Sequence, residues 1–200
     1  MIRIYWTYFS AERRQKRKVE HETGLALLYY ALQKDYEFSD IPAIAVTAEG
    51  KPYLAETDNL YFNITHCKDL AACAIGQVPI GIDAEGIRPF GEALQKKVLG
   101  TEEQRELEKL PEDKKKIQFL RYWTLKESYV KAKGCGLRIP PCQITFGLSE
   151  SREPVCVDLA YTCRQEMPDE GHVLSVIWKG GEQKTVSMPV DARELQFQDG

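Results

Sequence analysis

The sequence predicts an α+β fold built from two similar halves. Helical and strand-like patterns alternate along its 200 residues: one helix, a group of short strands, further helices, then strands again. Because no segment is repeated, the two halves would share an order of elements rather than a sequence. We place their boundary near residue 100, with an N-terminal half at 1–100 and a C-terminal half at 101–200.

The composition excludes several classes of protein. Lys and Arg number 27 against 30 Asp and Glu, a net charge of −3, whereas a nucleic-acid-binding domain is usually clearly basic. Hydrophobic residues at 43% and charged residues at 28% exclude wholesale disorder. No apolar run reaches the roughly 18 residues that span a bilayer, and no signal peptide is visible. The six cysteines form no C-x-x-C pair. We therefore expect reduced thiols, no zinc site, and a cytoplasmic protein without membrane or nucleic-acid partners.

The first helix is predicted at residues 10–33, with Ser10 as its N-cap. Residues 13–18 read RRQKRK and place five basic side chains at its start. Such a run is either a solvated face or a site for an anionic ligand, since Lys and Arg both suit phosphate groups. Nothing in the local sequence decides between the two.

The remaining elements follow from turn signals and caps. Thr101 and Gln104 form a capping-box pattern for a short helix that Pro111 ends. A longer helix is expected at 113–133, stopped by Gly134. The last residues, 193–200, are expected to fray. Strands are predicted for YFNIT, LAACAIG and PIGIDAE, the last two as a hairpin-like pair, and later for QITFGL, VCVDLAY, HVLSVIW and TVSMPV.

Two carboxylates share one face of a predicted strand. Asp83 and Glu85 stand two apart in GIDAE, so period-two geometry points both side chains the same way. Neighbouring carboxylates repel, and the pair needs a cation or a raised pKa. Taken alone, the pair is better explained by a solvated edge strand, which would tolerate both charges.

A third carboxylate lies in an apolar stripe of the long helix. Glu127 shares the face of Leu120 and Trp123, and Lys131 follows it by one turn. A buried carboxylate is costly unless it is paired or binds a metal. The alternative is a structural Glu127–Lys131 ion pair at i,i+4, which needs no ligand and is worth about 0.3–0.5 kcal/mol.

Together these acids predict a metal-assisted site for a phosphate ester or diphosphate. Three carboxylates suit a hard cation such as Mg²⁺, and Mn²⁺ accepts the same ligands. A lysine beside the metal would neutralise charge on a transferring phosphate. His66 is expected just past the end of a strand, with Thr65 beside it, and both offer phosphate contacts, although a lone histidine is more often structural.

Three segments resemble the surfactin-type 4′-phosphopantetheinyl transferases in order and spacing. They are FNITHCKDLAACAIG at 62–76, PIGIDAEGIRP at 79–89 and FLRYWTLKESYVKAKGCGL at 119–137. The similarity extends to the Gly-Lys-Pro of residues 50–52 and, more loosely, to residues 21–23. It covers the middle of the chain well and the last sixty or so residues only by pattern.

The resemblance implies a fold and a reaction. The fold would be a pseudo-dimer of two similar α+β halves, with the active site in the cleft between them. The reaction would move the 4′-phosphopantetheine arm of coenzyme A onto a serine of an apo acyl or peptidyl carrier protein, releasing adenosine 3′,5′-bisphosphate. Such carriers serve fatty-acid, polyketide and nonribosomal-peptide synthesis. Two halves in one chain make a monomer the expectation.

It also implies roles for the site residues. Asp83, Glu85 and Glu127 would hold Mg²⁺ against the diphosphate, and Glu127 would remove the serine proton, directly or through water, unless the metal makes a strong base unnecessary. Lys131 would stabilise the departing phosphate. The catalytic residues would be Glu127, Lys131 and Asp83. Coenzyme phosphates would be contacted by Lys51, Thr65, His66, Thr23, Arg13, Lys16 and Lys131.

One departure from the family pattern concerns the nucleotide end of the coenzyme. Glu22 stands where such proteins often carry Arg, and the basic run at 13–18 is available to compensate. The carrier protein is expected near residues 86–110. Two alternatives remain from other classes: a catalytically silent coenzyme A or carrier-protein binding module, and a Mg²⁺-dependent phosphohydrolase.

Overall fold

The computed structural model describes residues 1–39, 42–55, 57–148 and 153–195. Its helices are α1 Lys16–Tyr36, α2 Glu92–Val98, α3 Thr101–Glu108 and α4 Glu112–Lys133, with 3-10 turns η1 Gly136–Arg138, η2 Pro141–Gln143 and η3 Ala192–Glu194. Its strands are β1 Ile2–Tyr8, β2 Ile44–Val46, β3 Pro52–Leu54, β4 Tyr61–Cys67, β5 Leu70–Gly76, β6 Ile80–Gly86, β7 Phe146–Gly147, β8 Val155–Cys156, β9 Tyr161–Glu166, β10 His172–Lys179 and β11 Thr185–Pro189. The fold is mixed α+β, as the sequence predicts.

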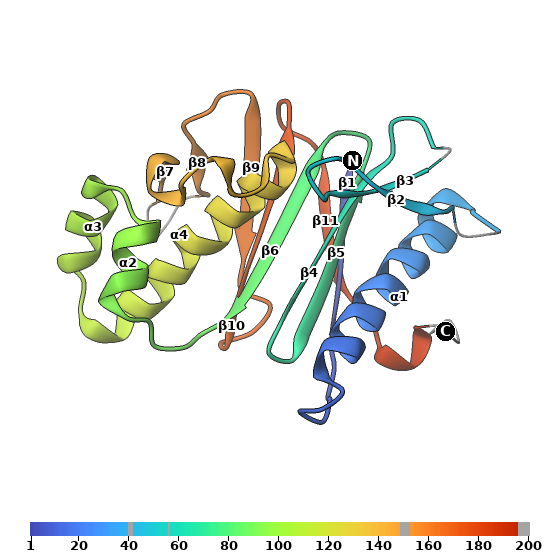
Figure 1. Ribbon diagram of the computed structural model, residues 1–200, viewed down its shortest axis with the longest axis horizontal. Helices are drawn as coiled ribbons and strands as arrows, with labels where there is room; N and C mark the ends of the chain where they lie inside the picture. The colour runs from blue at the N-terminus through green and yellow to red at the C-terminus, as the bar shows by residue number, and fades with distance from the viewer. Residues whose placement is uncertain (40–41, 56, 149–152, 196–200) are drawn as a thin grey trace.

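The elements form four layers. One sheet has the strand order β11-β1-β5-β4, and α1 packs on its outer face. A second sheet, β6-β10-β9, faces the first, and α4 packs on its outer face. Figure 1 shows α4 on the left and α1 on the right, with both sheets between them.

Each of the two central strands, β5 and β10, contributes to two cores because its side chains alternate. Leu70, Ala72 and Ala74 of β5 meet Leu174 and Val176 of β10 between the sheets. The opposite face of β5 packs under α1, and the opposite face of β10 packs under α4. Burial on both faces explains why these strands read as nearly continuous apolar runs.

The chain passes between the two sheets twice. The predicted hairpin of LAACAIG and PIGIDAE is wrong: β5 pairs with β1 and β4, while β6 pairs with β10. Both edges of β5 are occupied, so the short connection after Gly76 carries β6 into the facing sheet. Later, β11 returns to the first sheet and pairs with β1 in parallel. In each of the two sheets, therefore, a strand from before residue 100 pairs with a strand from after it. A division of the chain near residue 100 stays a prediction.

Two of the predicted helix starts differ from the structure. The first helix begins at Lys16 rather than Ser10 and extends to Tyr36. Its first turn contains no acidic residue, and the basic side chains there interact unfavourably with the positive end of the helix dipole. Nothing therefore favours extension of the helix toward Ser10. In α3 the N-cap is Gly100 rather than Thr101, because the Glu103 side chain accepts the Gly100 N–H at 2.8 Å.

The end of the long helix is confirmed, because Gly134 caps α4 with a left-handed φ of 67°. At the C-terminal end, residues 193–195 belong to or follow η3 and Leu195 is buried, so the predicted fraying is wrong there. Residues 196–200 lie outside the described part of the chain. All six cysteines are free. No helix in the described ranges is long and apolar enough to cross a bilayer.

Candidate active site

Strand β6 carries two of the predicted acids on the face that α4 covers. Gly81, Asp83 and Glu85 share this face by period-two alternation. A Cβ atom on Gly81 would lie 2.1 Å from the Ser128 carbonyl oxygen and 2.3 Å from the Ala132 nitrogen. Glycine is therefore required there, because any side chain would push the helix backbone away from the strand.

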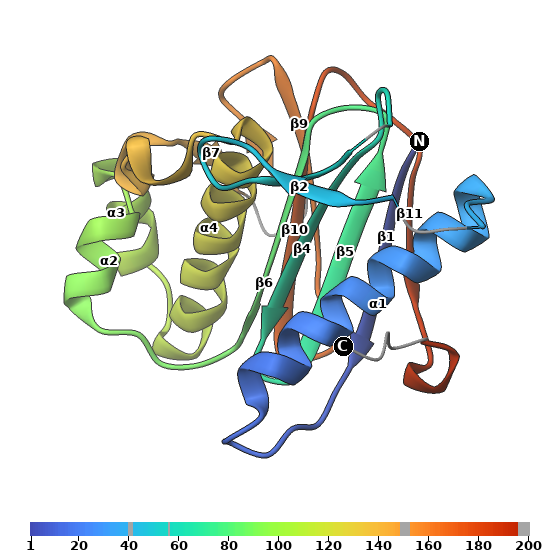
Figure 2. The same cartoon turned by 45° about the vertical axis from the view of Figure 1, so that its right-hand side comes forward.

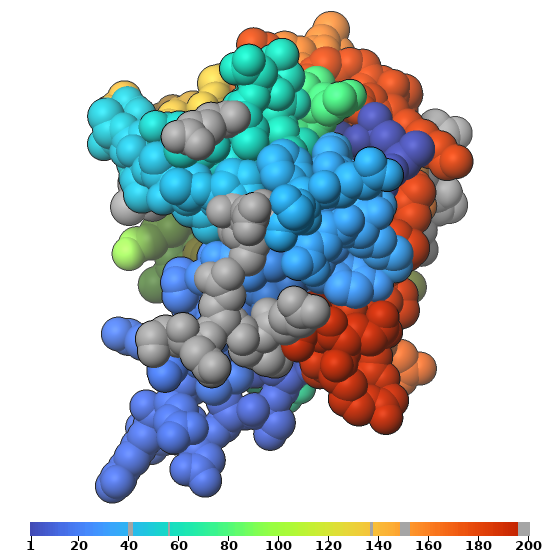
Figure 3. Space-filling model, turned by 90° about the vertical axis from the view of Figure 1, so that its right-hand side faces the viewer, coloured from blue at the N-terminus to red at the C-terminus, as the bar shows by residue number. Residues whose placement is uncertain are grey.

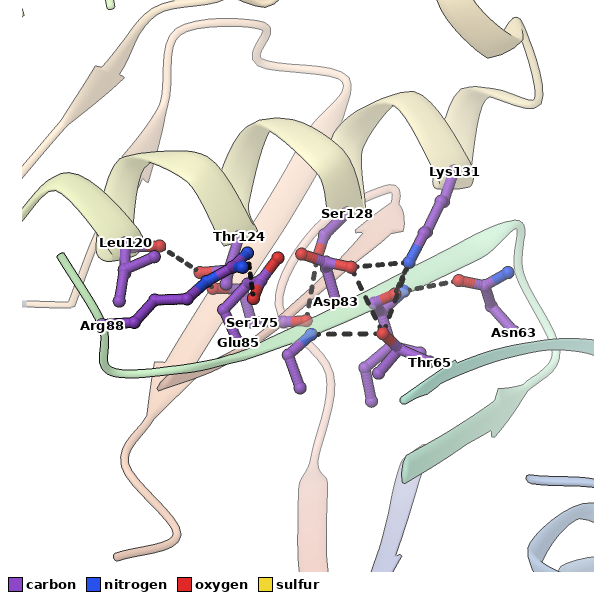
Figure 4. A network of polar contacts seen from close by, with 12 residues as sticks. Asn63, Thr65, Asp83, Glu85, Arg88, Leu120, Thr124, Ser128, Lys131 and Ser175 are labelled. Atoms are coloured by element: carbon purple, nitrogen blue, oxygen red, sulfur yellow. Dashed lines mark hydrogen bonds and ion pairs between the residues drawn. The ribbon is translucent and has the colours of Figure 1, made fainter. Parts of the chain in front are cut away.

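Asp83 is the centre of the site, and two other elements reach it. Lys131 of α4 donates to Asp83 Oδ1 at 2.7 Å, and the Thr65 hydroxyl of β4 donates to the same oxygen at 3.2 Å. Figure 4 shows the three side chains pointing toward one another. The other oxygen, Asp83 Oδ2, is buried and has no hydrogen-bond partner among the described residues. A buried carboxylate oxygen without a protein partner is costly, and such an oxygen suits the binding of a ligand.

Side chains of β4 connect the two sheets at this point. Asn63 Oδ1 accepts the Ile82 N–H at 2.8 Å, and Thr65 Oγ1 accepts the Ala84 N–H at 3.3 Å. Both side chains lie on the face of β4 that is turned away from α1. They satisfy backbone donors of β6 that no neighbouring strand reaches, and so they fix the distance between β4 and β6.

The three carboxylates affect one another electrostatically. Burial raises the pKa of Asp83, and the nearby Lys131 ammonium opposes that rise. Burial is also the main cause of the raised pKa of Glu85 and of Glu127, and the charge of Asp83 adds to both. Arg88 offsets part of the effect on Glu85, with its guanidinium 3.1 Å from Glu85 Oε2. The site therefore concentrates negative charge in a poorly solvated place.

These residues fit a hard divalent cation by their chemistry. The ligands would all be oxygen atoms, their charges repel, and Asp83 Oδ2 has no partner. Lys131 and Arg88 hold two of the acids in this structure, and no three His, Cys, Asp or Glu side chains of the described residues lie close enough together to bind a metal. In the described ranges no ion pair joins Glu127 to Lys131, because Lys131 reaches across to Asp83 instead.

Lys51 lies at the C-terminal end of α4. Its ammonium donates to the carbonyl oxygens of Lys131 at 2.6 Å, Ile80 at 3.0 Å and Ala132 at 3.2 Å. Burial lowers the pKa of Lys51 to about 8. The resemblance implies a phosphate contact for this residue, but in this structure its ammonium donates to backbone carbonyl oxygens. A cavity of about 270 Å³ opens beside it, lined in part by Tyr53, Phe62 and Lys133.

Thr65 and His66 point to opposite sides of β4, as adjacent strand residues must. His66 is exposed on the α1 side, with its Nδ1 3.7 Å from the Glu20 carboxylate. Glu20 is buried and also pairs with Lys16 at 3.5 Å. These three residues form a second polar cluster, on the opposite side of β4 from Asp83.

The remaining predicted residues lie on or before α1. Thr23 is buried, next to Gly24, whose Cβ would lie 2.5 Å from Ile64 Cγ2, so α1 packs closely on β4 here. Arg13 is exposed in the turn that leads into the helix. Figure 3 shows this blue segment protruding at the lower left of the molecule. Glu22 pairs with Lys18 at 3.5 Å, which balances the acid that departs from the family pattern.

Sequence reasoning missed a buried lysine next to Glu127. Lys126 has a fully buried side chain that pairs with Glu103 and donates to the Val98 carbonyl at 2.7 Å. It ties α4 to α2 and α3 rather than contributing to the acidic site. Its position among apolar neighbours, the same signal that singled out Glu127, would have marked it as buried.

It also missed the polar contacts beneath the site. Ser128 donates to the Ser175 carbonyl at 2.8 Å, and Thr124 and Ser175 share a hydroxyl hydrogen bond of 2.7 Å. Gln165 of β9 donates to the Ser175 hydroxyl at 2.8 Å. Ser175 lies directly opposite Asp83 in the β6–β10 ladder, so these bonds hold α4 in register over the acid. A cavity of about 580 Å³ lies elsewhere, between α4 and β9.

Comparison with known proteins identifies relatives of this chain. A family model described as the 4′-phosphopantetheinyl transferase superfamily matches residues 79–177, which contain all three acids and Lys131. A 4′-phosphopantetheinyl transferase of Bacillus subtilis is 31% identical over 140 residues, covering 66% of this chain and 62% of that protein. The 4′-phosphopantetheinyl transferase HetI of Nostoc sp. is 34% identical over 140 residues, covering 66% of this chain and 59% of that protein.

The chain therefore spans about six-tenths of the length of these relatives. The 4′-phosphopantetheinyl transferase Sfp of Bacillus subtilis is 28% identical over 145 residues, with coverages of 68% and 65%. Among solved structures, the holo-[acyl-carrier-protein] synthase of Thermotoga maritima superposes with a TM-score of 0.41 at 22% identity, over 52% of this chain and 64% of that one.

Proposed function

The chain belongs to the 4′-phosphopantetheinyl transferase superfamily, and from this premise we propose that it transfers the 4′-phosphopantetheine arm of coenzyme A to a serine of an apo acyl or peptidyl carrier protein. Adenosine 3′,5′-bisphosphate is the second product. The observation that carries the proposal is the meeting of Thr65, Asp83 and Lys131, from three elements, at an acidic and poorly solvated point.

The proposal includes a pseudo-dimeric architecture with the active site in the cleft between the halves. In its support, each sheet carries one long helix on its outer face, α1 on one and α4 on the other. The candidate residues lie where β4 of the first sheet approaches β6 of the second. We include a monomeric state in the proposal, because one chain would supply both halves. Free cysteines agree with a cytoplasmic location.

Asp83, Glu85 and Glu127 are the residues that would hold Mg²⁺ or Mn²⁺. When bound, the cation would neutralise charge on the coenzyme diphosphate and on the departing phosphate. Asp83 would offer Oδ2, the oxygen without a partner, while Oδ1 keeps its bond to Thr65.

The chain's own residues then account for the transfer. The serine hydroxyl oxygen forms a bond to the phosphorus on the pantetheine side of the diphosphate, and the bond from that phosphorus to the bridging oxygen breaks. Glu127 takes the serine proton, and its raised pKa makes it a better proton acceptor than an ordinary glutamate. Lys131 faces the oxygen that leaves and stabilises its negative charge.

Coenzyme phosphates contact side chains on both sides of β4 in this proposal. Thr65 shares the Lys131 side, while the His66 ring and the Lys16 ammonium lie on the α1 side, and Arg13 adds a charge beyond the helix start. Thr23 would contribute its hydroxyl from α1. The carrier protein docks near residues 86–110, where the end of β6 leads into α2 and α3.

One experiment tests the proposal directly. The full chain is incubated with coenzyme A, Mg²⁺ and several apo carrier proteins, and the products are weighed by mass spectrometry. We expect a carrier that gains one phosphopantetheine arm. Phosphate release without carrier modification would instead support the phosphohydrolase. Tight coenzyme binding without turnover would support the silent binding module, and either result overturns the transferase.

A further inference from the structure

Lys51 uses all of its hydrogen-bonding capacity on the protein backbone. An ammonium group has three N–H donors, and the three acceptors of Lys51 are the carbonyl oxygens of Lys131, Ala132 and Ile80. Two of these belong to the last turn of α4, and the third begins strand β6. The lysine itself comes from the turn between β2 and β3, a segment that Figure 2 shows reaching the end of α4. Its side chain therefore joins three segments.

The helix end explains why a cation belongs there. The last four carbonyl groups of a helix have no partner within the helix and carry a partial negative charge. Gly134 ends α4 by donating to the carbonyls of Val130 and Lys131, which leaves the Ala132 carbonyl to Lys51. A phosphate contact by Lys51 would require this ammonium to give up backbone acceptors in a half-buried place, and the phosphate would then approach the negative end of α4.

The turn that carries Lys51 is built to aim it. Gly50 has a φ of 86°, which favours glycine, and its N–H donates to the Thr47 carbonyl at 2.9 Å. The Lys51 N–H donates to the Thr47 hydroxyl at 3.2 Å. A Cβ on Gly134 would lie 3.4 Å from Lys51 Cδ, an ordinary van der Waals distance, so the lysine stem packs directly against the end of α4.

We propose that Lys51 is a positioning residue that holds Lys131 and Asp83 in place, rather than a contact for a coenzyme phosphate. Its acceptors are the carbonyl of Lys131 itself and that of Ile80, three residues before Asp83 on the same strand. The Lys131 ammonium bonds to Asp83 Oδ1 and to the Ile82 carbonyl. Lys51 therefore clamps the backbone on both sides of the contact that brings helix and strand together. Its catalytic consequence rests on the proposed transfer, whereas the clamp itself does not.

Hydrogen exchange tests the clamp without any assay of activity. In Lys51→Met, the amides of residues 131–134 should exchange at least about tenfold faster than in the unchanged chain, equivalent to about 1.4 kcal/mol of local stability. Amides in the middle of α1 should not change. Lys184→Met removes an exposed lysine of similar size and should leave the α4 amides unchanged. Unchanged exchange at 131–134 in Lys51→Met overturns the proposal.

Binding and kinetics then separate positioning from phosphate contact. Coenzyme A affinity is measured by calorimetry at low and high salt, without carrier protein. A positioning role predicts an affinity within about threefold of the unchanged chain and the same salt dependence, with a kcat at least tenfold lower. A tenfold loss of affinity with a weaker salt dependence would show a phosphate contact and overturn the proposal.

Lys51→Arg keeps the test decisive where Lys51→Met does not fold. Arginine retains a cation and several donors, so it should restore part of the exchange protection at residues 131–134 while the chain stays folded. If a folded Lys51→Arg protein showed no more protection at residues 131–134 than an unprotected helix end, that result would contradict the clamp. If the unchanged chain transfers no phosphopantetheine, the proposed function fails, but the exchange result stands on its own.

Discussion

The two long helices that flank the sheets bury different kinds of surface. Under α1 the buried side chains are mainly apolar, and its polar residues Glu20 and Thr23 lie near the exposed basic end. Under α4 a lysine and two hydroxyl residues are fully enclosed, each with a named partner. Buried polar groups with satisfied hydrogen bonds fix one arrangement, whereas apolar packing and exposed charges tolerate several.

This difference separates two tasks of a site that handles phosphates. The α4 side holds acids and Lys131 at fixed positions, which suits chemistry. The α1 side presents basic side chains near His66 at the surface, which suits the capture of an anionic ligand. Substitutions on the α4 side should therefore reduce turnover or stability sharply, and those on the α1 side should change affinity in a way that depends on salt.

The largest effect is expected for Glu127→Gln on the α4 side. The change removes the proposed base and metal ligand while keeping the shape, so kcat should fall by about 10²–10⁴-fold. The melting temperature should not fall, because burial already disfavours this charge. Steady-state kinetics and thermal unfolding measure both. The control Glu182→Gln alters an exposed acid and should retain full activity. Near-normal turnover in Glu127→Gln would remove this residue from the site.

Next in size is the loss of the buried ion pair behind the site. Lys126→Met leaves the Glu103 carboxylate buried without its cation, which should cost about 3–5 kcal/mol of unfolding free energy. Adding Glu103→Gln should recover part of that loss, since the unpaired charge disappears. Chemical denaturation of both variants measures this. A cost below 1 kcal/mol would mean that the pair does not join α4 to α3 in solution.

A smaller effect is expected where β4 meets β6. Asn63→Leu keeps the size of the side chain but leaves the Ile82 N–H without an acceptor, at a cost of about 1–3 kcal/mol. Because the spacing between Thr65 and Asp83 depends on this contact, kcat should fall together with stability. Gln77→Leu, which changes an exposed amide in the β5–β6 connection, is the matched control. Unchanged kcat in a destabilised Asn63→Leu protein would show that the contact is structural only.

The basic segment before and within the first turn of α1 should affect binding alone. Replacing its five basic residues, Arg13, Arg14, Lys16, Arg17 and Lys18, with glutamine should weaken coenzyme A binding about tenfold at low salt and far less at high salt. The kcat at saturating coenzyme should stay near that of the unchanged chain. Glutamine at Lys179 and Lys184, both exposed, controls for net charge. An unchanged affinity would make the segment a solvated face.

The smallest effect concerns pH. The folded-state pKa values of Glu85 and Glu127 are raised, mainly by burial. For a raised acid, the folded state binds more protons than the unfolded state, so stability is greatest below the unfolded pKa and is lost as pH rises through the folded pKa. Acidification from neutral pH should thus stabilise the unchanged chain relative to a Glu85→Gln, Glu127→Gln double variant. The measurement is the melting temperature of both proteins as a function of pH. The same pH dependence in the two proteins would contradict the mutual repulsion of these acids.

Several features of the site follow from short stretches of sequence. The period of two places Asp83 and Glu85 on one face of a strand, and the helical period places Glu127 one turn before Lys131. Gly134 marks the end of α4 because only a residue that accepts a positive φ ends a helix in this way. Each of these signals acts within a few residues of the chain, so no partner from elsewhere is needed to detect it.

The tertiary structure decided what these residues meet. The sequence pattern could not show that β6 leaves β5 for the facing sheet. One edge of β5 is taken by the preceding strand β4, but the other is taken by β1 from the distant start of the chain. Nor could it show that Lys131 pairs with Asp83 rather than Glu127, or that Lys51 serves the end of α4. Such contacts join residues between 29 and 81 positions apart. Their free energy depends on which layers pack together, and no local period or cap records that.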